Sequence, residues 1–387
     1  MGITRLMNLL REKAPNAIKT VSLHTYTGHA FALDASMAMY QFLISTQQIK
    51  SGFSIAELRD SNGNLTGHLL GLYNRSIMLM ENGIKPVWVF DGKPPEAKSH
   101  VLKQRKQRKE DAEKGKSEAK DEGDMERALK LSNQTVKIDQ QMTNDAKRLV
   151  QLLGLPMIEA PSEAEATCSI LAKSGKVYAA ATEDMDSLCF GCPVLIRDIN
   201  NKNEPVIEIN LEQVLTELKI NMDEFIDLCI LCGCDYSSKI EGIGVINAYK
   251  LIKEHKNIEG VIKYAENFNK DPNHKKKLTY DKDEFNYVEA RELFKHPEVI
   301  DVDKVNLVWK NPDKEGLKKF LVDEKNFNEN RINNALVRIE NAKSKSSQMR
   351  MENFFKMSQT VHSSSGVKGK TKNESNIKAK AKGKGKK

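Results

Sequence analysis

Short apolar segments that predict buried strands alternate with helical patterns along the first 200 residues of this chain. The segments at 29–35 and 85–91 are rich in aromatic and β-branched residues and are bounded by glycine or proline. Three further segments of this kind lie at 155–160, 176–182 and 193–199. Strands that alternate with helices predict an α/β fold with a mostly parallel, doubly wound sheet and helices on both faces.

Acidic residues follow four of these predicted strands and a fifth apolar segment further along. They are Asp34, Asp91, Glu163, Glu165, Asp184, Asp186 and Asp235. Because ligands of an open parallel sheet bind outside the carboxyl ends of its strands, we expect all seven carboxylates at one edge. Seven negative charges gathered there would repel one another strongly.

Two divalent cations would relieve this repulsion. Oxygen ligands in such numbers suit Mg²⁺, or Mn²⁺ in its place, rather than zinc. Two such ions about 4 Å apart can hold both the attacking and the leaving oxygen of a phosphoryl displacement. The residues alone therefore predict metal-assisted phosphoryl transfer on a polyanion.

Each acid also has an ordinary structural explanation when it is taken alone. Asp34 could cap a helix or close a turn, and Ser162 with Glu165 matches the S-x-x-E pattern of a capping box. Repetition at five segment ends favours the shared metal site over seven independent caps.

A basic run follows the second acid-bearing segment. Six lysines and arginines occur between residues 98 and 109 with no acid among them, and an almost purely polar stretch continues to about residue 130. Such a stretch cannot pack in a core, so it is a solvated helical excursion or a linker. Lys98 and Arg105 are two helical turns apart and share a face, from which they could bind a scissile phosphodiester beside the metals. The alternative is a solvated helix face.

The remainder of the chain predicts a helical region and a basic tail. Residues 211–340 are helical in pattern and include a hairpin-like segment at 239–255. The chain's net charge is +8, yet residues 343–387 carry 13 lysines and arginines against two glutamates, so the rest is slightly acidic. We expect a disordered arm that suits nucleic acid, an acidic partner or nuclear import, with a plain solvated tail as the alternative.

Several function classes are disfavoured. No stretch reaches the roughly 18 apolar residues that a membrane helix requires, so we expect no membrane attachment. Six cysteines in 387 residues suit a reducing compartment. The pairs Cys189–Cys192 and Cys229–Cys232 invite a zinc interpretation, but they lie further apart than the pairs of a zinc ribbon, so we favour buried thiols.

Six motifs occur in order along the chain: DASMAMYQFL, VWVFDGKPPEAK, EAPSEAEATC, YAAATEDMDSL, GCDY and GIG. Together they resemble the eukaryotic flap endonuclease 1 family of structure-specific 5′ nucleases over about residues 1–355. The resemblance implies a parallel sheet crossed by a helical arch and followed by a helix–two-turn–helix module. It divides the chain into a nuclease region (1–105), an arch (106–137), an internal nuclease region with the helix-hairpin module (138–256), a helical part of the core (257–342) and the tail (343–387).

The resemblance also implies roles for individual residues. The seven acids correspond to the ligands of two metal ions, and Lys98 and Arg105 to arch residues that contact the scissile phosphate. A base-stacking role is implied for Tyr40. Further DNA contacts are implied for Arg75, Glu163, Gly233, Asp235, Gly242 and Gly244. The family also binds K⁺ at the helix-hairpin module.

The reaction that the resemblance implies is hydrolysis of a DNA phosphodiester near the base of a 5′ flap, with 5′–3′ exonuclease activity as well. Its setting would be Okazaki-fragment maturation and long-patch base excision repair in the nucleus, and nucleolar or mitochondrial locations are compatible. We expect a monomer.

Three places depart from the family pattern. Val245, Ile246 and Asn247 follow GIG where proline and basic residues are usual, and Gln47 and the pair at 133–134 also replace basic residues. The backbone groups of the hairpin remain available for a phosphate and for K⁺, whereas direct side-chain contacts there are not carried over.

One cluster stands out from the polar tail: Gln348, Met351, Phe354 and Phe355. Q-x-x-M-x-x-F-F resembles the peptide that docks on the replication sliding clamp, proliferating cell nuclear antigen. A single helical turn presents the three apolar side chains together to a groove. The alternative is a last core helix that packs on the body.

Other functions remain open at this stage. They are another 5′ nuclease of the same superfamily, such as an exonuclease, a junction resolvase or a repair-type incision nuclease, and a non-catalytic DNA scaffold bound to the clamp. The short arch argues against the repair-type nuclease, which has a very long insertion there. The presence of all seven acids argues against the scaffold.

Overall fold

The structure is a computed structural model that describes residues 2–50, 54–199, 204–272 and 276–342. Met1–Lys343 forms one compact unit, built on a seven-stranded sheet. The sheet order is β1-β9-β8-β7-β2-β5-β6. The strands are β1 (Ile18–Val21), β2 (Ala30–Asp34), β5 (Lys85–Phe90), β6 (Met157–Glu159), β7 (Ala179–Ala181), β8 (Val194–Arg197) and β9 (Val206–Asn210).

The predicted mostly parallel sheet is confirmed. Strands β8, β7, β2, β5 and β6 pair in parallel, and β9 pairs antiparallel with both β8 and β1. All five predicted strands are present, and their ends agree with the prediction to within three residues. The strands β1 and β9 were not predicted, nor was the hairpin of β3 (Gln48–Lys50) and β4 (Ser54–Ala56). β1 lacks a buried residue, so its sequence carries little strand pattern.

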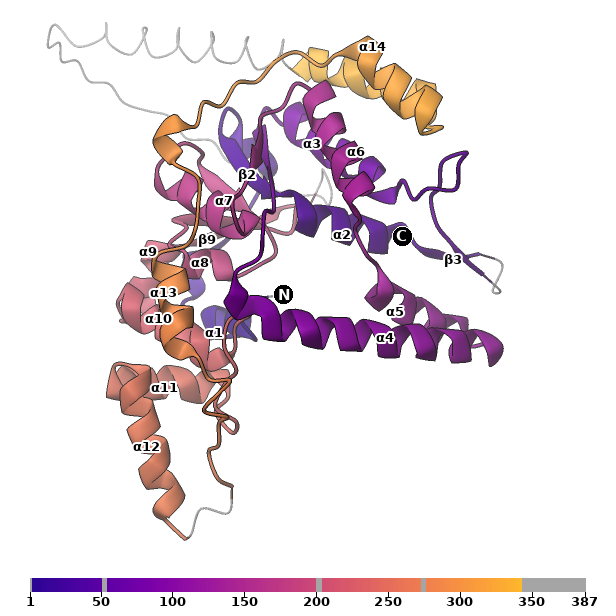
Figure 1. Cartoon of the computed structure of the whole chain (residues 1–387). Coiled ribbons are helices and arrows are strands. Elements are labelled where there is room, and N and C mark those ends of the chain that lie inside the picture. The colour runs from indigo at the N-terminus through magenta and orange to yellow at the C-terminus, as the bar shows by residue number, and fades with distance from the viewer. Residues whose placement is uncertain (1, 51–53, 200–203, 273–275, 343–387) are drawn as a thin grey trace, which may run out of the picture. The chain divides into compact units, whose positions relative to one another are not determined.

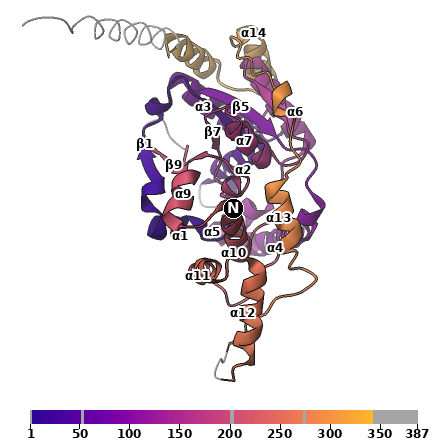
Figure 2. The ribbon, with the colours of Figure 1, turned by 90° about the vertical axis from the view of Figure 1, so that its left-hand side faces the viewer.

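Helices cover both faces of the sheet, as predicted (Figures 1 and 2). Alternate residues of β2 and β5 point to opposite sides: Phe31 and Trp88 pack with α2, α3 and α6, whereas Ala32 and Val87 pack with α1, α7, α9 and α10. These helices are α1 (Leu6–Lys13), α2 (Ala35–Ser45), α3 (Gly67–Glu81), α6 (Gln140–Leu152), α7 (Ala164–Lys173), α9 (Leu211–Leu218) and α10 (Met222–Cys232). Period-two burial along each strand thus builds two separate apolar cores.

The polar stretch after β5 is helical and is not a linker. A short 3₁₀ turn, η3 (Glu96–Lys98), leads into α4 (Ser99–Asp121), which packs against α5 (Met125–Thr135) (Figure 1). The contact between them is narrow, since Ala112, Ala119 and Ala128 are buried while most of α4 is exposed. This pair corresponds to the helical arch that the family resemblance implied, although α4 begins at Ser99, before the expected start of the arch at residue 106.

The second half is mainly helical, as predicted, with an extended stretch at 297–313. It contains α11 (Val245–His255), α12 (Ile258–Lys270), α13 (Tyr287–Lys295), α14 (Lys314–Leu317), a π-helical segment (Lys318–Glu324) and a helix over 329–342. The short helix α8 (Asp186–Cys189) lies between β7 and β8. Short 3₁₀ turns lie at Pro15–Ala17, Leu23–Tyr26 and Val302–Lys304. Figures 1 and 2 both show α12 reaching away from the sheet.

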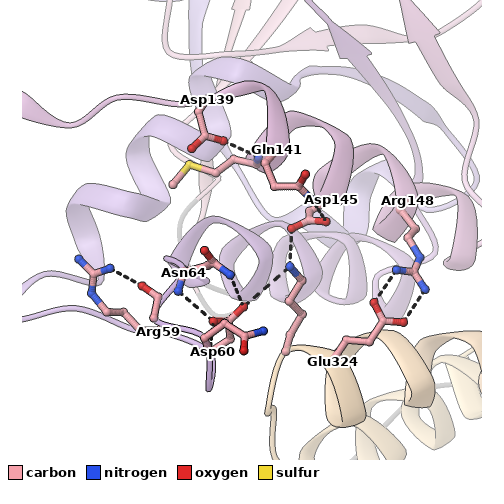
Figure 3. Close-up of polar contacts among 12 residues, drawn as sticks. Arg59, Asp60, Asn64, Asp139, Gln141, Asp145, Arg148 and Glu324 are labelled. Atoms are coloured by element: carbon pink, nitrogen blue, oxygen red, sulfur yellow. Dashed lines mark hydrogen bonds and ion pairs between the residues drawn. The ribbon is translucent and has the colours of Figure 1, made fainter.

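A cluster of charges fixes the segment after the π-helix to α6 and to the loop before α3 (Figure 3). Lys325 Nζ lies 2.5 Å from Asp145 and 4.0 Å from Asp60, and all three side chains are nearly buried. Beside them, Arg148 donates two hydrogen bonds to the Glu324 carboxylate, at 2.6 and 2.8 Å. These contacts join segments that lie 176 to 265 residues apart in the chain.

None of the described helices is long and apolar enough to cross a membrane. The tail from residue 343, with the predicted clamp motif at Gln348, Met351, Phe354 and Phe355, lies outside the described residues.

Candidate active site

The first two acids are held by backbone donors at the carboxyl ends of adjacent strands. Asp34 is the last residue of β2, and its Oδ1 accepts the Met37 N–H at 2.9 Å, so it also caps α2. Asp91 directly follows β5 and accepts the Ala164 N–H at 2.8 Å. The capping explanation for Asp34 is therefore correct but incomplete, because burial and then the charge of Asp91 raise the pKa of this carboxyl.

The next two acids begin α7. Glu163 is the N-cap residue and Glu165 lies in the first turn, and the N-cap side chain makes no capping hydrogen bond. The capping-box explanation for Ser162 and Glu165 is therefore wrong. Glu163 instead accepts hydrogen bonds from Lys98 Nζ and from the Tyr236 hydroxyl.

Asp184 and Asp186 form the third pair, after β7, where side-chain oxygens of the loop accept hydrogen bonds from its own backbone. The Asp184 N–H donates to Thr182 Oγ1 at 3.1 Å, and the Asp186 N–H donates to Asp184 Oδ1 at 3.0 Å. One carboxylate oxygen each of Glu165, Asp184 and Asp186 lies within 4.8 Å of the other two. Three separate chain positions thus bring their acids to one point.

This donor set fits a metal ion. Asp186 is 2 % exposed, and its Oδ1 is buried without a hydrogen-bond partner. Burial and neighbouring carboxylates raise the pKa of Glu165 and Asp186, so ionised side chains are disfavoured here without a cation. A buried, unpartnered carboxylate oxygen among other acids is the environment that a hard divalent cation with oxygen ligands satisfies.

Asp235 meets the basic residues of the arch. It follows α10 after a turn at Gly233, whose φ of 104° suits only glycine. Arg105 Nη2 donates to both Asp235 oxygens, at 2.8 and 2.6 Å, and Lys98 Nζ lies 3.2 Å from Asp235. Although burial lowers the pKa of Lys98, the charges of Glu163, Glu165 and Asp235 raise it overall, so this ammonium stays charged.

Family comparisons agree with this geometry. Two family models match the chain, the XPG N-terminal domain over residues 1–112 and the XPG I-region over residues 154–235. The chain is 51% identical to Flap endonuclease 1 of Tetrahymena thermophila over 388 residues, which is 100% of each chain. It is 49% identical to Flap endonuclease 1-1 of Paramecium tetraurelia, over 98% of each. This chain belongs to the flap endonuclease 1 family. The family consists of structure-specific DNA nucleases.

Solved structures of related nucleases share the fold. Flap endonuclease-1 from Methanococcus jannaschii superposes with a TM-score of 0.63 at 35% identity, covering 85% of this chain and 96% of that one. The catalytic core of Rad2 in complex with DNA substrate superposes with a TM-score of 0.67 at 25% identity, covering 87% and 100%.

The remaining residues that flap endonuclease resemblance singled out lie outside the acid cluster. Tyr40 is on α2, and its hydroxyl donates to the Asn133 carbonyl of α5 at 3.3 Å. Arg75 is on α3, with its guanidinium carbon 4.5 Å from the centre of the Phe42 ring, and burial lowers its pKa to about 10. Gly242 and Gly244 lie in the exposed turn that leads into α11.

Two residues of the site escaped sequence reasoning. Tyr236 is 3 % exposed and donates to Glu163, which lies 73 residues away in the chain. Gly2 lies against Asp184 and Asp186. The GCDY motif gave Tyr236 a place beside Asp235 but no partner, and nothing in the sequence marked Gly2.

The zinc alternative finds no support within the described residues. Among the described residues, the only set of three or more potential metal ligands that converges on one point is formed by the carboxylates of Glu165, Asp184 and Asp186. The cysteines are free thiols, five of them buried, and burial raises the pKa of Cys192 and Cys232 to about 12. They behave as the small apolar side chains that the sequence predicted.

Proposed function

We propose that this protein is a metal-dependent endonuclease that hydrolyses DNA near the base of a 5′ flap, with 5′–3′ exonuclease activity on the same site. The observation that carries the proposal is the convergence of acids from separate segments, with Lys98 and Arg105 of the arch in contact with two of them. The sequence identity of 51% to Flap endonuclease 1 of Tetrahymena thermophila over the whole chain supports the same reaction.

Two divalent cations, Mg²⁺ or Mn²⁺, would be held by the seven carboxylates: Asp34, Asp91, Glu163, Glu165, Asp184, Asp186 and Asp235. When bound, such cations supply Lewis-acid stabilisation of the phosphate oxygens as negative charge develops on them. The protein's own task is to keep most of these carboxylates buried and to fix their positions. Backbone donors fix Asp34 and Asp91, and the Tyr236 hydroxyl fixes Glu163.

Lys98 and Arg105 would orient the scissile phosphate. Without DNA their charges are balanced by Glu163 and Asp235. A phosphate that enters between the arch and the acids offers these two cations an alternative anionic partner, and the charge that builds up during hydrolysis strengthens that contact. Charge-assisted bonds aimed at the reacting group raise the rate more than they raise affinity.

Other parts of the molecule would hold the duplex. Tyr40 could stack on a base below the arch, and Arg75 lies on the neighbouring helix. Gly242 and Gly244 are exposed, and Gly244 has no side chain to cap α11, so the N-terminus of this helix suits a backbone phosphate, with K⁺ bound beside it. Such contacts position the enzyme without reading sequence.

The cellular role proposed here rests on the resemblance alone. It comprises Okazaki-fragment maturation and long-patch repair in the nucleus, with docking on the sliding clamp through residues 348–355. The protein would act as a monomer on branched DNA.

A cleavage assay tests the proposal. A 5′-labelled flap duplex, a blunt duplex with a 5′ end and a four-way junction are incubated with and without Mg²⁺. We expect flap cleavage that needs Mg²⁺, and Asp184→Ala should reduce it by at least about 1,000-fold while flap binding in Ca²⁺ persists. Asp323→Ala, an exposed carboxylate outside the site, is the matched control.

Two outcomes would overturn the proposal. Preference for the four-way junction, with symmetrical incision, would identify a resolvase instead. Absence of cleavage by the wild-type protein under all metal conditions would leave the scaffold alternative.

A further inference from the structure

The segment Gly2–Arg5 is anchored inside the acid cluster. Ile3 is 4 % exposed and Leu6, at the start of α1, is fully buried, so apolar packing holds the segment in place. Both of its ends adopt left-handed backbone conformations, with φ of 75° at Gly2 and 57° at Arg5. A segment held at both ends in an uncommon conformation has a defined position relative to its neighbours.

Gly2 touches the two acids of the loop after β7. A Cβ atom at Gly2 would lie 1.8 Å from Asp184 Oδ1 and 2.7 Å from Asp186 Oδ1. Both distances are far below the contact distance of carbon and oxygen, so one of the groups would have to move. The backbone of Gly2 therefore lies directly against these carboxylates, with no room for any side chain.

The nearer of these two oxygens, Asp184 Oδ1, stabilises the loop that carries both acids. Asp184 Oδ1 accepts the Asp186 N–H at 3.0 Å, which folds the loop that carries both acids. Asp184 is 3 % exposed and Asp186 is 2 % exposed, so neither carboxylate has solvent into which it could swing. Displacement of Asp184 Oδ1 would break this bond and move both acids together.

The segment Gly2–Arg5 also contacts the turn that precedes Asp235. The Thr4 N–H donates to the Gly233 carbonyl at 3.3 Å, two residues before Asp235. Gly2 and Thr4 line a groove of about 630 Å³ together with Asp235 and with His100 at the start of α4. The segment therefore spans the space between the loop of Asp184 and the turn of Asp235.

We propose that Gly2 is a positioning residue for the metal-binding carboxylates: its backbone acts as a spacer that sets Asp184 and Asp186 relative to the turn of Asp235. The inference rests on the proposed metal binding. It assigns Gly2 no contact with substrate, and it requires glycine there both for the backbone angle and for the missing Cβ.

A matched pair of variants separates these two requirements. Gly2→Ala introduces both the strain of a positive φ and the overlap with Asp184. Gly175→Ala introduces the same strain, since φ is also 75° at Gly175, but a Cβ there has nothing within 4 Å. Gly175→Ala therefore controls for the strain alone, away from the acids, and the double variant described below isolates the overlap.

Metal binding without DNA is the first measurement. Free Mn²⁺ is followed by electron paramagnetic resonance during titration of the full chain. We expect Gly2→Ala to weaken Mn²⁺ binding and to lower the single-turnover rate, each by about 10- to 100-fold, as is usual for residues that orient ligands. Flap-DNA affinity in Ca²⁺ should change less than twofold, higher Mn²⁺ should restore part of the rate, and Gly175→Ala should match the wild type within twofold.

A double variant tests the cause. In an Asp184→Ala background the nearer of the two oxygens that the Cβ would strike is absent, so adding Gly2→Ala should cause a much smaller further loss of Mn²⁺ binding than it causes in the wild type. If Gly2→Ala alone lowers the melting temperature, the double variant should regain it.

The proposal is wrong if Gly2→Ala binds Mn²⁺ and cleaves within twofold of the wild type, or if it causes an equal loss in the Asp184→Ala background. Failure of the wild-type protein to bind Mn²⁺ would instead refute the proposed metal site itself.

Discussion

Protonation of His68 should destabilise this protein by an amount that the structure allows us to calculate. His68 lies near the start of α3 and is 1 % exposed. Burial lowers its pKa from 6.5 to about 4, and the nearby charges of Asp145 and Lys325 act in opposite directions on the ring. The folded protein therefore carries a neutral imidazole at pH values where the unfolded chain carries an imidazolium.

The sign follows from proton binding. Between pH 6.5 and about 4 the unfolded chain binds a proton at His68 that the folded protein does not, so acid favours unfolding. The stabilisation is present in full above pH 6.5 and is lost as pH falls towards 4. The whole shift corresponds to about 3 kcal/mol, and about 2 kcal/mol of it is lost between pH 7 and pH 5.

The assay is urea unfolding of wild type and His68→Leu at both pH values. Leucine does not titrate, so its own effect on packing cancels when each protein is compared with itself. The comparison is needed because the acid cluster acts in the opposite sense: carboxyls with raised pKa values become less destabilising as pH falls. The wild type should lose about 2 kcal/mol more than His68→Leu between pH 7 and pH 5. Equal losses in the two proteins would refute the reasoning.

Three further predictions concern the site, the scaffold and the tail. Lys98→Ala and Arg105→Ala should each lower the single-turnover cleavage rate by about 100-fold or more with much smaller losses of flap affinity, and equal losses in rate and affinity would show ordinary backbone contacts. Arg291 of α13 donates two hydrogen bonds of 2.8 Å to the carboxylate of Asp227, which is 3 % exposed. Arg291→Leu leaves this buried carboxylate without its cation and should lower the free energy of unfolding in urea by about 3–5 kcal/mol. Phe354→Ala with Phe355→Ala should abolish stimulation by the sliding clamp and leave activity on free flap DNA unchanged, which a titration of tail peptides against the clamp at two salt concentrations can check.

The central parallel strands β2, β5 and β7 were predictable because they are buried on both sides, whereas β6 at the sheet edge has no buried residue and was predicted from its apolar sequence alone. Each appears as a continuous apolar run, and the rule for ligand sites at strand ends then places their acids together. β1 and β9 were not predictable in the same way. β1 is an edge strand with no buried residue, and its pairing with β9 joins segments almost 190 residues apart. The antiparallel part of the sheet is therefore decided by tertiary packing.

In the candidate site, too, local spacing was predictable from the sequence and contacts between distant segments were not. Spacing along one helix predicted that Lys98 and Arg105 share a face, since helical neighbours follow from local geometry. Their contacts with Glu163 and Asp235 cross 65 and 130 residues and needed the folded chain. Gly2 could not be predicted at all, because a glycine has no side chain whose chemistry would indicate what it contacts. Only the arrangement of the carboxylates around it gives the residue a role.

The departure from the family pattern at the start of α11 has less consequence in the structure than the sequence suggested. Gly244, the N-cap residue of this helix, is exposed and has no side chain that could cap the first amides of α11. These amides and the positive end of the helix dipole attract a phosphate without help from a side chain. Val245 and Ile246 are half-buried and pack against the core below, which fixes the turn rather than opening it. Lys250 and Lys253 are exposed on the same helix and supply positive charge one to two turns further on. A backbone-centred contact of this kind tolerates the loss of proline and basic residues, because its geometry depends on the turn at Gly242 and Gly244 and not on the residues that replaced them.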